Sequence, residues 1–264
     1  MTTHKKADTL QPTTKLEQII PVIGFGTWEI TGRTCTDSVQ NALDIGYRHI
    51  DTAQMYRNEE EVGNGIKRSK VQRADIFVTT KIATSNLEPD LIKSTTNESL
   101  HRLDMDFVDL LLIHWPVPGM DLKGCLETMF ELKDKGKIKH VGVSNFNPQL
   151  FKKALDIGPV VNNQVKFSMH EKQFENLQVA KQHNVTVTAY SPLERGSITS
   201  DDVLSDIGKK YNKSASQVEL RWLIQLGNVS VIPKAESENH RTENFHIFDF
   251  ELSDEDMERI RQLG

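Results

Sequence analysis

The sequence predicts one α/β domain of the (β/α)8, or TIM-barrel, class. Strand-like and helix-like patterns alternate from Ile19 to the end of the chain, and eight of them are strand-like. The length of 264 residues suits such a barrel, which usually has about 250 residues. No linker or change in composition divides the chain. We therefore expect a barrel domain at 16–264, preceded by a polar N-terminal extension at 1–15.

Short apolar runs define the strands, and helical patterns separate them. The strands are expected at 20–25, 47–50, 76–80, 108–113, 138–143, 160–165, 185–190 and 229–232. The helices are expected near 37–43, 59–69, 89–103, 123–135, 148–155, 174–183 and 201–225, followed by a last helix that starts at Ser253.

Local signals set several of these boundaries. Pro89 stands early in its helix, where proline is tolerated. Lys-Gly-Lys at 135–137 ends the helix expected at 123–135. The segment 201–225 is long enough for two helices, with a break around 212–214. Ser253 supplies a cap, and the acids after it suit the first turn of the last helix.

Composition and charge exclude several classes of protein. Hydrophobic residues make up 37% and charged residues 26% of the chain, which permits an ordinary core and argues against disorder. A net charge of -5 does not favour a nucleic-acid partner. No apolar stretch approaches the roughly 20 residues that span a bilayer, so no membrane partner is expected. Cys35 and Cys125 fit no metal or redox spacing, and a reducing cytoplasm is the expected location.

Four polar residues lie where strand patterns stop. Asp51, Lys81 and His114 close three strands, and Tyr56 follows one of them by a short loop. In a parallel barrel these strand ends meet at one mouth, where active sites are built. A phenol with a pKa of about 10 keeps its proton at neutral pH, and a nearby ammonium lowers that pKa. Tyr56 is thus the expected proton donor to a carbonyl, tuned by Lys81, which Asp51 anchors, while His114 orients the carbonyl oxygen.

None of these four groups can supply electrons, so hydride must come from a cofactor. Each residue also has a structural interpretation. Asp51 and Lys81 can form a structural ion pair, Tyr56 can be a loop aromatic, and His114 can be a satisfied histidine at a strand end. Taken together, the functional interpretation is favoured, because neighbouring strand ends are the functional positions of this fold.

Longer motifs around these residues resemble those of the aldo/keto reductase family. The motifs are Gly-Tyr-Arg-His-Ile-Asp-Thr-Ala at 46–53, Tyr56, Asn-Glu-Glu-Glu-Val-Gly at 58–63, Leu-Ile-His-Trp-Pro at 112–116, Gly-Val-Ser-Asn-Phe at 142–146, Ala-Tyr-Ser-Pro-Leu at 189–193 and Val-Ile-Pro-Lys at 231–234. The resemblance implies the same four catalytic roles in a monomeric enzyme. It implies NADPH-dependent reduction of small aldehydes and ketones, including aromatic aldehydes, α-oxoaldehydes and keto-sugars. The reverse reaction, oxidation of alcohols or sugars, is an alternative direction.

The resemblance also implies a nicotinamide dinucleotide stretched across the barrel mouth. Tyr190 would stack on the nicotinamide, whose carboxamide would be held by Ser144, Asn145 and Gln164. Ser191 and Leu193 would lie along the pyrophosphate, Lys234 would meet the adenosine 2′-phosphate, and Asn244 the adenine. The other implied cofactor contacts are Gly26, Thr27, Asp51, Ile232, Ala235, His240 and Glu243. The implied substrate contacts are Trp28, Met55, Tyr56, His114 and Trp115. Residues 24–29 lack the third glycine of G-x-G-x-x-G, which argues only against a Rossmann domain.

The sequence departs from the family pattern at the phosphate-binding end and around the substrate. Ala235 and His240 stand where relatives often have serine and arginine. NADPH is favoured because Lys234 is present. Histidine is charged only part of the time near neutrality, unlike arginine, so the preference is expected to be weaker, and NADH is an alternative cofactor. For His240 and its neighbour Arg241 the alternative is a solvated helix start. Ile82-Ala83 removes an aromatic wall, and the loop at 116–121 is short. We also expect no covering loop after Gly264. An open, shallow pocket that takes many aldehydes weakly is expected.

Two other functions fit parts of the pattern. A redox-sensing or regulatory subunit would bind the cofactor with negligible turnover, but the four intact polar residues weigh against it. A metal-dependent barrel hydrolase would need histidines or acids at ligand spacing. The nine histidines of the chain include no His-x-His at a strand end, so no metal is expected.

Overall fold

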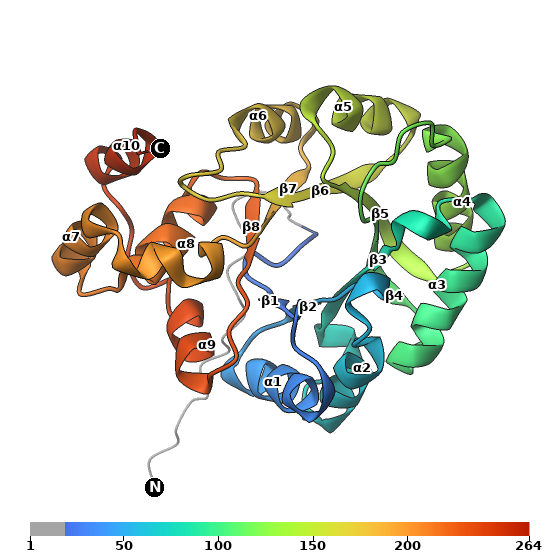
Figure 1. Ribbon diagram of the computed structural model, residues 1–264, viewed down its shortest axis with the longest axis horizontal. Coiled ribbons are helices and arrows are strands. Elements are labelled where there is room, and N and C mark those ends of the chain that lie inside the picture. The colour runs from blue at the N-terminus through green and yellow to red at the C-terminus, as the bar shows by residue number, and fades with distance from the viewer. Residues whose placement is uncertain (1–18, 264) are drawn as a thin grey trace, which may run out of the picture.

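The computed structural model describes residues 19–263, and the extension expected at 1–15 lies outside them. Eight parallel strands follow one another in chain order, from β1 to β8, and form a barrel. Helices surround the strands on the outside, as the view along the barrel shows (Figure 1). The predicted (β/α)8 fold is confirmed.

Most elements lie within a few residues of their predicted positions. The strands are β1 (Phe25–Gly26), β2 (His49–Asp51), β3 (Phe77–Ile82), β4 (Val108–Ile113), β5 (Ile138–Ser144), β6 (Val160–Lys166), β7 (Thr186–Tyr190) and β8 (Val229–Ile232). The helices are α1 (Gly32–Ile45), α2 (Glu59–Arg68), α3 (Pro89–Leu103), α4 (Leu122–Asp134), α5 (Pro148–Ile157), α6 (Phe174–His183), α7 (Asp202–Tyr211), α8 (Ala215–Gln225), α9 (Glu238–Phe245) and α10 (Asp254–Arg261). Short 3-10 helices include η1 (Gln54–Tyr56) and η4 (Glu194–Ser200).

The expected break between α7 and α8 is present. Asn212 ends α7 in the left-handed conformation, with φ of 55°, which asparagine tolerates better than most residues. Ser214 then begins α8 through a reciprocal capping box with Gln217. Ser253 caps α10, and its side chain accepts a hydrogen bond from the backbone N–H of Asp256, as expected from the sequence.

The first strand is shorter than the predicted run at 20–25. Pro21 has no backbone N–H to donate to a neighbouring strand. The segment before β1 pairs with β8 through an isolated bridge between Ile23 and Val231. Gly24 N donates to Val231 O at 2.8 Å, and Val231 N donates to Val22 O at 2.9 Å. These two bonds join the segment before β1 to β8 and close the barrel.

Gly26 serves close packing at this seam. Its φ lies outside the left-handed range, but a Cβ atom there would lie 2.8 Å from the carbonyl oxygen of Ile232. The lack of a Cβ atom therefore permits a close approach between two backbones. That approach matters for the site, because Gly26 and Ile232 both line its cavity.

The core lies between the barrel and its helices. Trp222 of α8 is fully buried and meets Phe167 and Phe174 edge to face, with ring centroids 6.2 and 6.4 Å apart. Truncating such an aromatic residue to alanine typically costs about 3–5 kcal/mol. Within residues 19–263, no helix has the length and apolar character that crossing a bilayer requires.

Candidate active site

The four polar residues singled out from the sequence lie together at the C-terminal mouth of the barrel. Asp51 ends β2, Lys81 is the penultimate residue of β3, and His114 follows β4 directly. Tyr56 is the last residue of η1, after which Arg57 turns the chain with φ of 56°. This short 3-10 helix brings the phenol back over the strand ends.

Lys81 is the centre of the hydrogen-bond network. Its Nζ donates to Asp51 Oδ1 at 2.5 Å, to the carbonyl oxygen of Thr52 at 2.9 Å and to Tyr56 Oη at 3.1 Å. The other carboxylate oxygen of Asp51 accepts from Gln164 Nε2 at 2.7 Å. All three ammonium protons of Lys81 thus have acceptors, which a buried lysine requires to stay charged.

Burial and charge act in opposite directions on this pair. Burial raises the pKa of Tyr56, and the positive charge of Lys81 partly opposes that rise. Burial alone would lower the pKa of Lys81, but Asp51 and Tyr56 raise it above its ordinary value. The effect of Lys81 on the phenol has the sign expected from the sequence, but the net pKa of Tyr56 is raised and not lowered, because burial has the larger effect. The phenol therefore keeps its proton at neutral pH.

His114 faces Tyr56 as a neutral ring. The two ring centroids are 5.6 Å apart, and the rings are inclined by 76°. Burial lowers the pKa of His114 to about 3, and the charge of Lys81 acts in the same direction. Its Nδ1 atom is buried and has no hydrogen-bond partner within residues 19–263. A neutral imidazole carries one N–H and can donate one hydrogen bond to a ligand without adding charge.

A cavity of about 500 Å³ opens beside these residues. Tyr56, His114 and the three predicted substrate residues Trp28, Met55 and Trp115 line it. Those three side chains are unusually exposed for large apolar residues, at 38%, 51% and 44%. Exposed apolar residues gathered at a cavity that also contains a few polar groups are typical of a ligand site.

The residues expected around the nicotinamide carboxamide form a connected cluster in the same cavity. Tyr190 Oη donates to Asn145 Oδ1 at 2.9 Å, and Asn145 Nδ2 donates to the carbonyl oxygen of His114 at 3.0 Å. Ser144 Oγ donates to the carbonyl oxygen of Gln164 at 2.8 Å. Asn145 holds φ of 62°, a left-handed conformation often found at functional sites.

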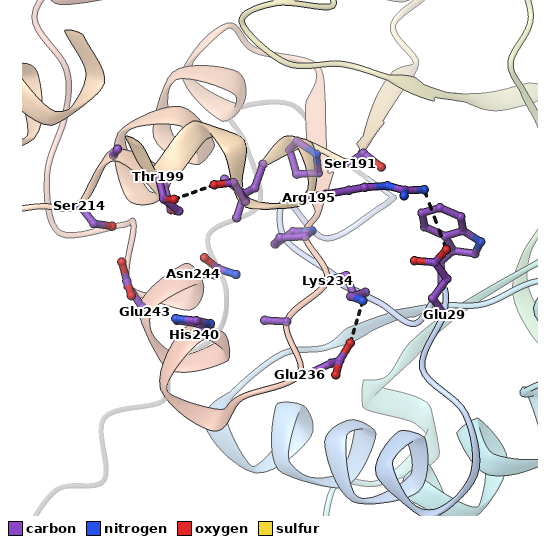
Figure 2. A pocket seen from close by; sticks show the side chains of 18 residues that line it. Glu29, Ser191, Arg195, Thr199, Ser214, Lys234, Glu236, His240, Glu243 and Asn244 are labelled. Atoms are coloured by element: carbon purple, nitrogen blue, oxygen red, sulfur yellow. Dashed lines mark hydrogen bonds and ion pairs between the residues drawn. The ribbon is translucent and has the colours of Figure 1, made fainter. Parts of the chain in front are cut away.

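A second cavity of about 500 Å³ lies next to the first, and Figure 2 shows the side chains that line it. The two share Trp28, Ser191, Arg195 and Lys234 as lining residues, so they form one extended cleft. Except for Thr27, the remaining predicted cofactor contacts line this second part: Leu193, Ala235, His240, Glu243 and Asn244.

Two residues lie differently from their expectation. Thr27 lines neither cavity; it is fully buried, and its hydroxyl donates to the carbonyl oxygen of Asp51 at 2.8 Å. It therefore supports the strand end that carries Asp51. Arg241 lies in α9 but is buried, and its Nη1 atom donates to the carbonyl oxygens of Ala235 and Glu236. The alternative of a solvated helix start is wrong for Arg241, whereas His240 is exposed.

Several charged residues that were not predicted from the sequence also line the cleft. Arg195 lies 4.7 Å from the ring centroid of Trp28 and 3.9 Å from the carboxylate of Glu29. Lys166 and Glu236 also line the cleft. A usable signal existed for Arg195, since Arg195-Gly196 follows the strand-end motif at 189–193, where barrel loops reach the mouth.

Comparison with protein families matches residues 22–264 to the Aldo/keto reductase family. The chain belongs to this family. The glyoxal reductase of Bacillus subtilis (strain 168) is 41% identical over 263 residues, covering 97% of this chain and 94% of that protein. The 9,11-endoperoxide prostaglandin H2 reductase of Trypanosoma cruzi (strain CL Brener) is 40% identical, covering 93% of this chain and 88% of that protein.

Solved structures agree with this assignment. The crystal structure of an aldo/keto reductase from Brucella melitensis is 38% identical and superposes with a TM-score of 0.88, covering 93% of this chain and 95% of that chain. The present aldo/keto reductase is therefore an oxidoreductase whose cleft occupies the usual place for a barrel enzyme.

The cleft has the features that a nicotinamide dinucleotide needs. It is extended, with the ring of Tyr190 at the catalytic end and the cation of Lys234 between the two cavities. A flat ring suits stacking, and a lysine suits a phosphate. Within residues 19–263, no group of three or more His, Cys, Asp or Glu side chains is arranged to hold a metal ion.

Proposed function

We propose that this aldo/keto reductase reduces small aldehydes and ketones to alcohols with NADPH, and that Tyr56 donates the proton. One observation carries the proposal: Lys81 Nζ lies 3.1 Å from Tyr56 Oη, and Tyr56 lines the same cavity as His114. The printed names of relatives, such as glyoxal reductase, support carbonyl reduction as the reaction class.

The four polar residues divide the proton chemistry between them. The nicotinamide cofactor supplies hydride when it is bound in the cleft. The carbonyl oxygen gains negative charge as the carbonyl is reduced, and Tyr56 gives its phenolic proton to that oxygen. Lys81 stabilises the phenolate that remains, and Asp51 keeps Lys81 charged. His114, being neutral, donates a hydrogen bond to the same oxygen and orients it.

The cleft residues would hold the cofactor in an extended form. Tyr190 would stack on the nicotinamide, with Ser144, Asn145 and Gln164 on its carboxamide. The remaining cofactor contacts would be Gly26, Asp51, Ser191, Leu193, Ile232, Lys234, Ala235, His240, Glu243 and Asn244.

Small carbonyl compounds suit the shape of the cavity. Trp28 and Trp115 offer flat apolar walls, while Ile82 is buried and provides no aromatic wall. We infer that aromatic aldehydes, α-oxoaldehydes and keto-sugars react, and that the reverse oxidation of alcohols is accessible. A pocket of this kind discriminates weakly between small apolar groups, by about 1–3 kcal/mol per group.

The test is the initial rate of NADPH oxidation with glyoxal, a reactive aromatic aldehyde and a bulky, rigid ketone. We expect the aldehydes to react with similar catalytic efficiency. If the rigid ketone exceeded both aldehydes by orders of magnitude, the open-pocket proposal would be wrong. If the protein bound NADPH tightly but oxidised it in the presence of none of these carbonyl compounds, the redox-sensing alternative would replace the reductase.

A further inference from the structure

An acid and a base are paired at the end of the cleft where the adenosine phosphate is expected. Lys234 Nζ donates to Glu236 Oε1 at 2.9 Å, and both side chains line the second cavity, as Figure 2 shows. Their side chains are 33% and 60% exposed, so the pair is accessible to a ligand. Lys234, the cation that would bind a phosphate, is thus already paired with the carboxylate of Glu236.

Arg241 cannot replace Lys234 as a phosphate ligand. Its Nε atom donates to Asn41 Oδ1 at 2.8 Å. Its Nη1 atom donates to Ser38 Oγ and to the backbone carbonyl oxygens of Ala235 and Glu236, at 3.1, 3.1 and 2.7 Å. The guanidinium is therefore used inside the fold. Its two bonds to the carbonyls of 235 and 236 fix the segment that carries the carboxylate.

The charged side chains around this cavity do not favour a dianion. Arg195 and Lys234 are its fixed cations, and three carboxylates, of Glu29, Glu236 and Glu243, line the same space. Arg195 is already within 3.9 Å of Glu29. His240, which also lines this cavity, is exposed. A 2′-phosphate would have to compete with Glu236 for Lys234, and the negative charge of Glu236 would also repel it.

A ribose hydroxyl meets the opposite situation. A carboxylate accepts hydrogen bonds from hydroxyl groups, and an Asp or Glu at the ribose is how many dinucleotide enzymes recognise the 2′-hydroxyl of NAD. We propose that Glu236 determines cofactor choice, because it occupies Lys234 in competition with a 2′-phosphate and accepts a hydrogen bond from a 2′-hydroxyl. NADH is then a working cofactor, and the advantage of NADPH is small. This inference rests on the proposed cofactor site but not on turnover.

The test measures binding of two adenosine fragments by calorimetry, so that it does not depend on catalysis. The probes are adenosine 2′,5′-bisphosphate and 5′-AMP, and the variant Glu236→Gln keeps the shape of the side chain but removes its charge. We expect the bisphosphate to bind about tenfold more tightly to the variant, the change that 1.4 kcal/mol produces. Binding of 5′-AMP should stay the same or weaken. The gain should shrink in high salt, because exposed charges are screened.

Two matched variants act as controls. Glu238→Gln removes an exposed carboxylate of α9 that does not line the cavity, and it should leave both affinities unchanged. Lys234→Ala should weaken the bisphosphate and spare 5′-AMP. Equal changes for the two probes in Glu236→Gln, or the same gain in Glu238→Gln, would overturn the inference. Probe binding as expected without any carbonyl reduction would refute the proposed reaction and leave the role of Glu236 intact.

Discussion

Replacing Lys81 by methionine separates the catalytic from the structural role of the network. Methionine keeps the length of the side chain but removes the ammonium that holds Asp51, Thr52 and Tyr56 together. Asp51 is only 1% exposed and would keep the hydrogen bond from Gln164. Breaking a buried ion pair on one side typically costs about 3–5 kcal/mol, because it leaves an uncompensated charge. We expect Lys81→Met to lower the free energy of unfolding by that amount.

The double variant Asp51→Asn, Lys81→Met should recover most of this stability, since it removes the stranded carboxylate as well. It should not recover activity. Without the ammonium, nothing opposes the rise that burial gives the pKa of Tyr56, and proton donation of this kind contributes about 10²–10⁴-fold to rate. The free energy of unfolding is measured in urea by circular dichroism, and activity is measured as NADPH oxidation with an aldehyde.

A surface lysine provides the control. Lys67 pairs with Asp104 at 2.7 Å, but both side chains are more than 70% exposed, so Lys67→Met should change stability and rate little. If Lys81→Met were no less stable than Lys67→Met, the buried pair would not hold the site together. If the double variant turned over at the wild-type rate, Lys81 would have no part in the chemistry.

Two further predictions concern ionisation. Glu219 of α8 is fully buried, its Oε1 accepts from Met169 N at 2.8 Å, and burial raises its pKa to about 8. The ionised form of Glu219 is disfavoured in the folded state, so the free energy of unfolding should fall as the pH rises from about 5 to 8. Glu219→Gln should remove on the order of 3 kcal/mol of that fall. A variant that changed the free energy of unfolding equally at both pH values would contradict this prediction. For His114, whose pKa is about 3, the wild-type reduction rate should show no step near pH 6.5, and His114→Ala should lower kcat/KM by about 10²–10³-fold. A step near pH 6.5 that the variant abolishes would show that the ring is charged during turnover.

The sequence predicts the barrel, and the meeting of Asp51, Lys81 and His114 at one mouth, because both depend on local patterns. The helix Pro89–Leu103 has its predicted bounds, since a proline at its first position and apolar residues at helical spacing define it. Asp51, Lys81 and His114 were found because parallel strands bring their ends to one edge. Neither inference needed knowledge of contacts distant in sequence.

The features that the sequence did not predict depend on distant partners. The pairing near Gly24 that closes the barrel requires Val231, which lies far along the chain. The buried position of Arg241 depends on Ser38 and Asn41 of α1, and no pattern within residues 238–245 points the side chain inward. The net pKa of Tyr56 likewise depends on how deeply the fold buries it.

The most direct test of the central claim compares the wild type with Tyr56→Phe in the same aldehyde assay, with NADPH binding followed by fluorescence. Phenylalanine deletes only the phenolic oxygen, so turnover should fall by about 10²–10⁴-fold while the affinity for NADPH stays nearly unchanged. Loss of activity with intact cofactor binding is the result predicted for a proton donor. A variant that reduces the aldehyde at the wild-type rate would contradict the claim that Tyr56 supplies the proton.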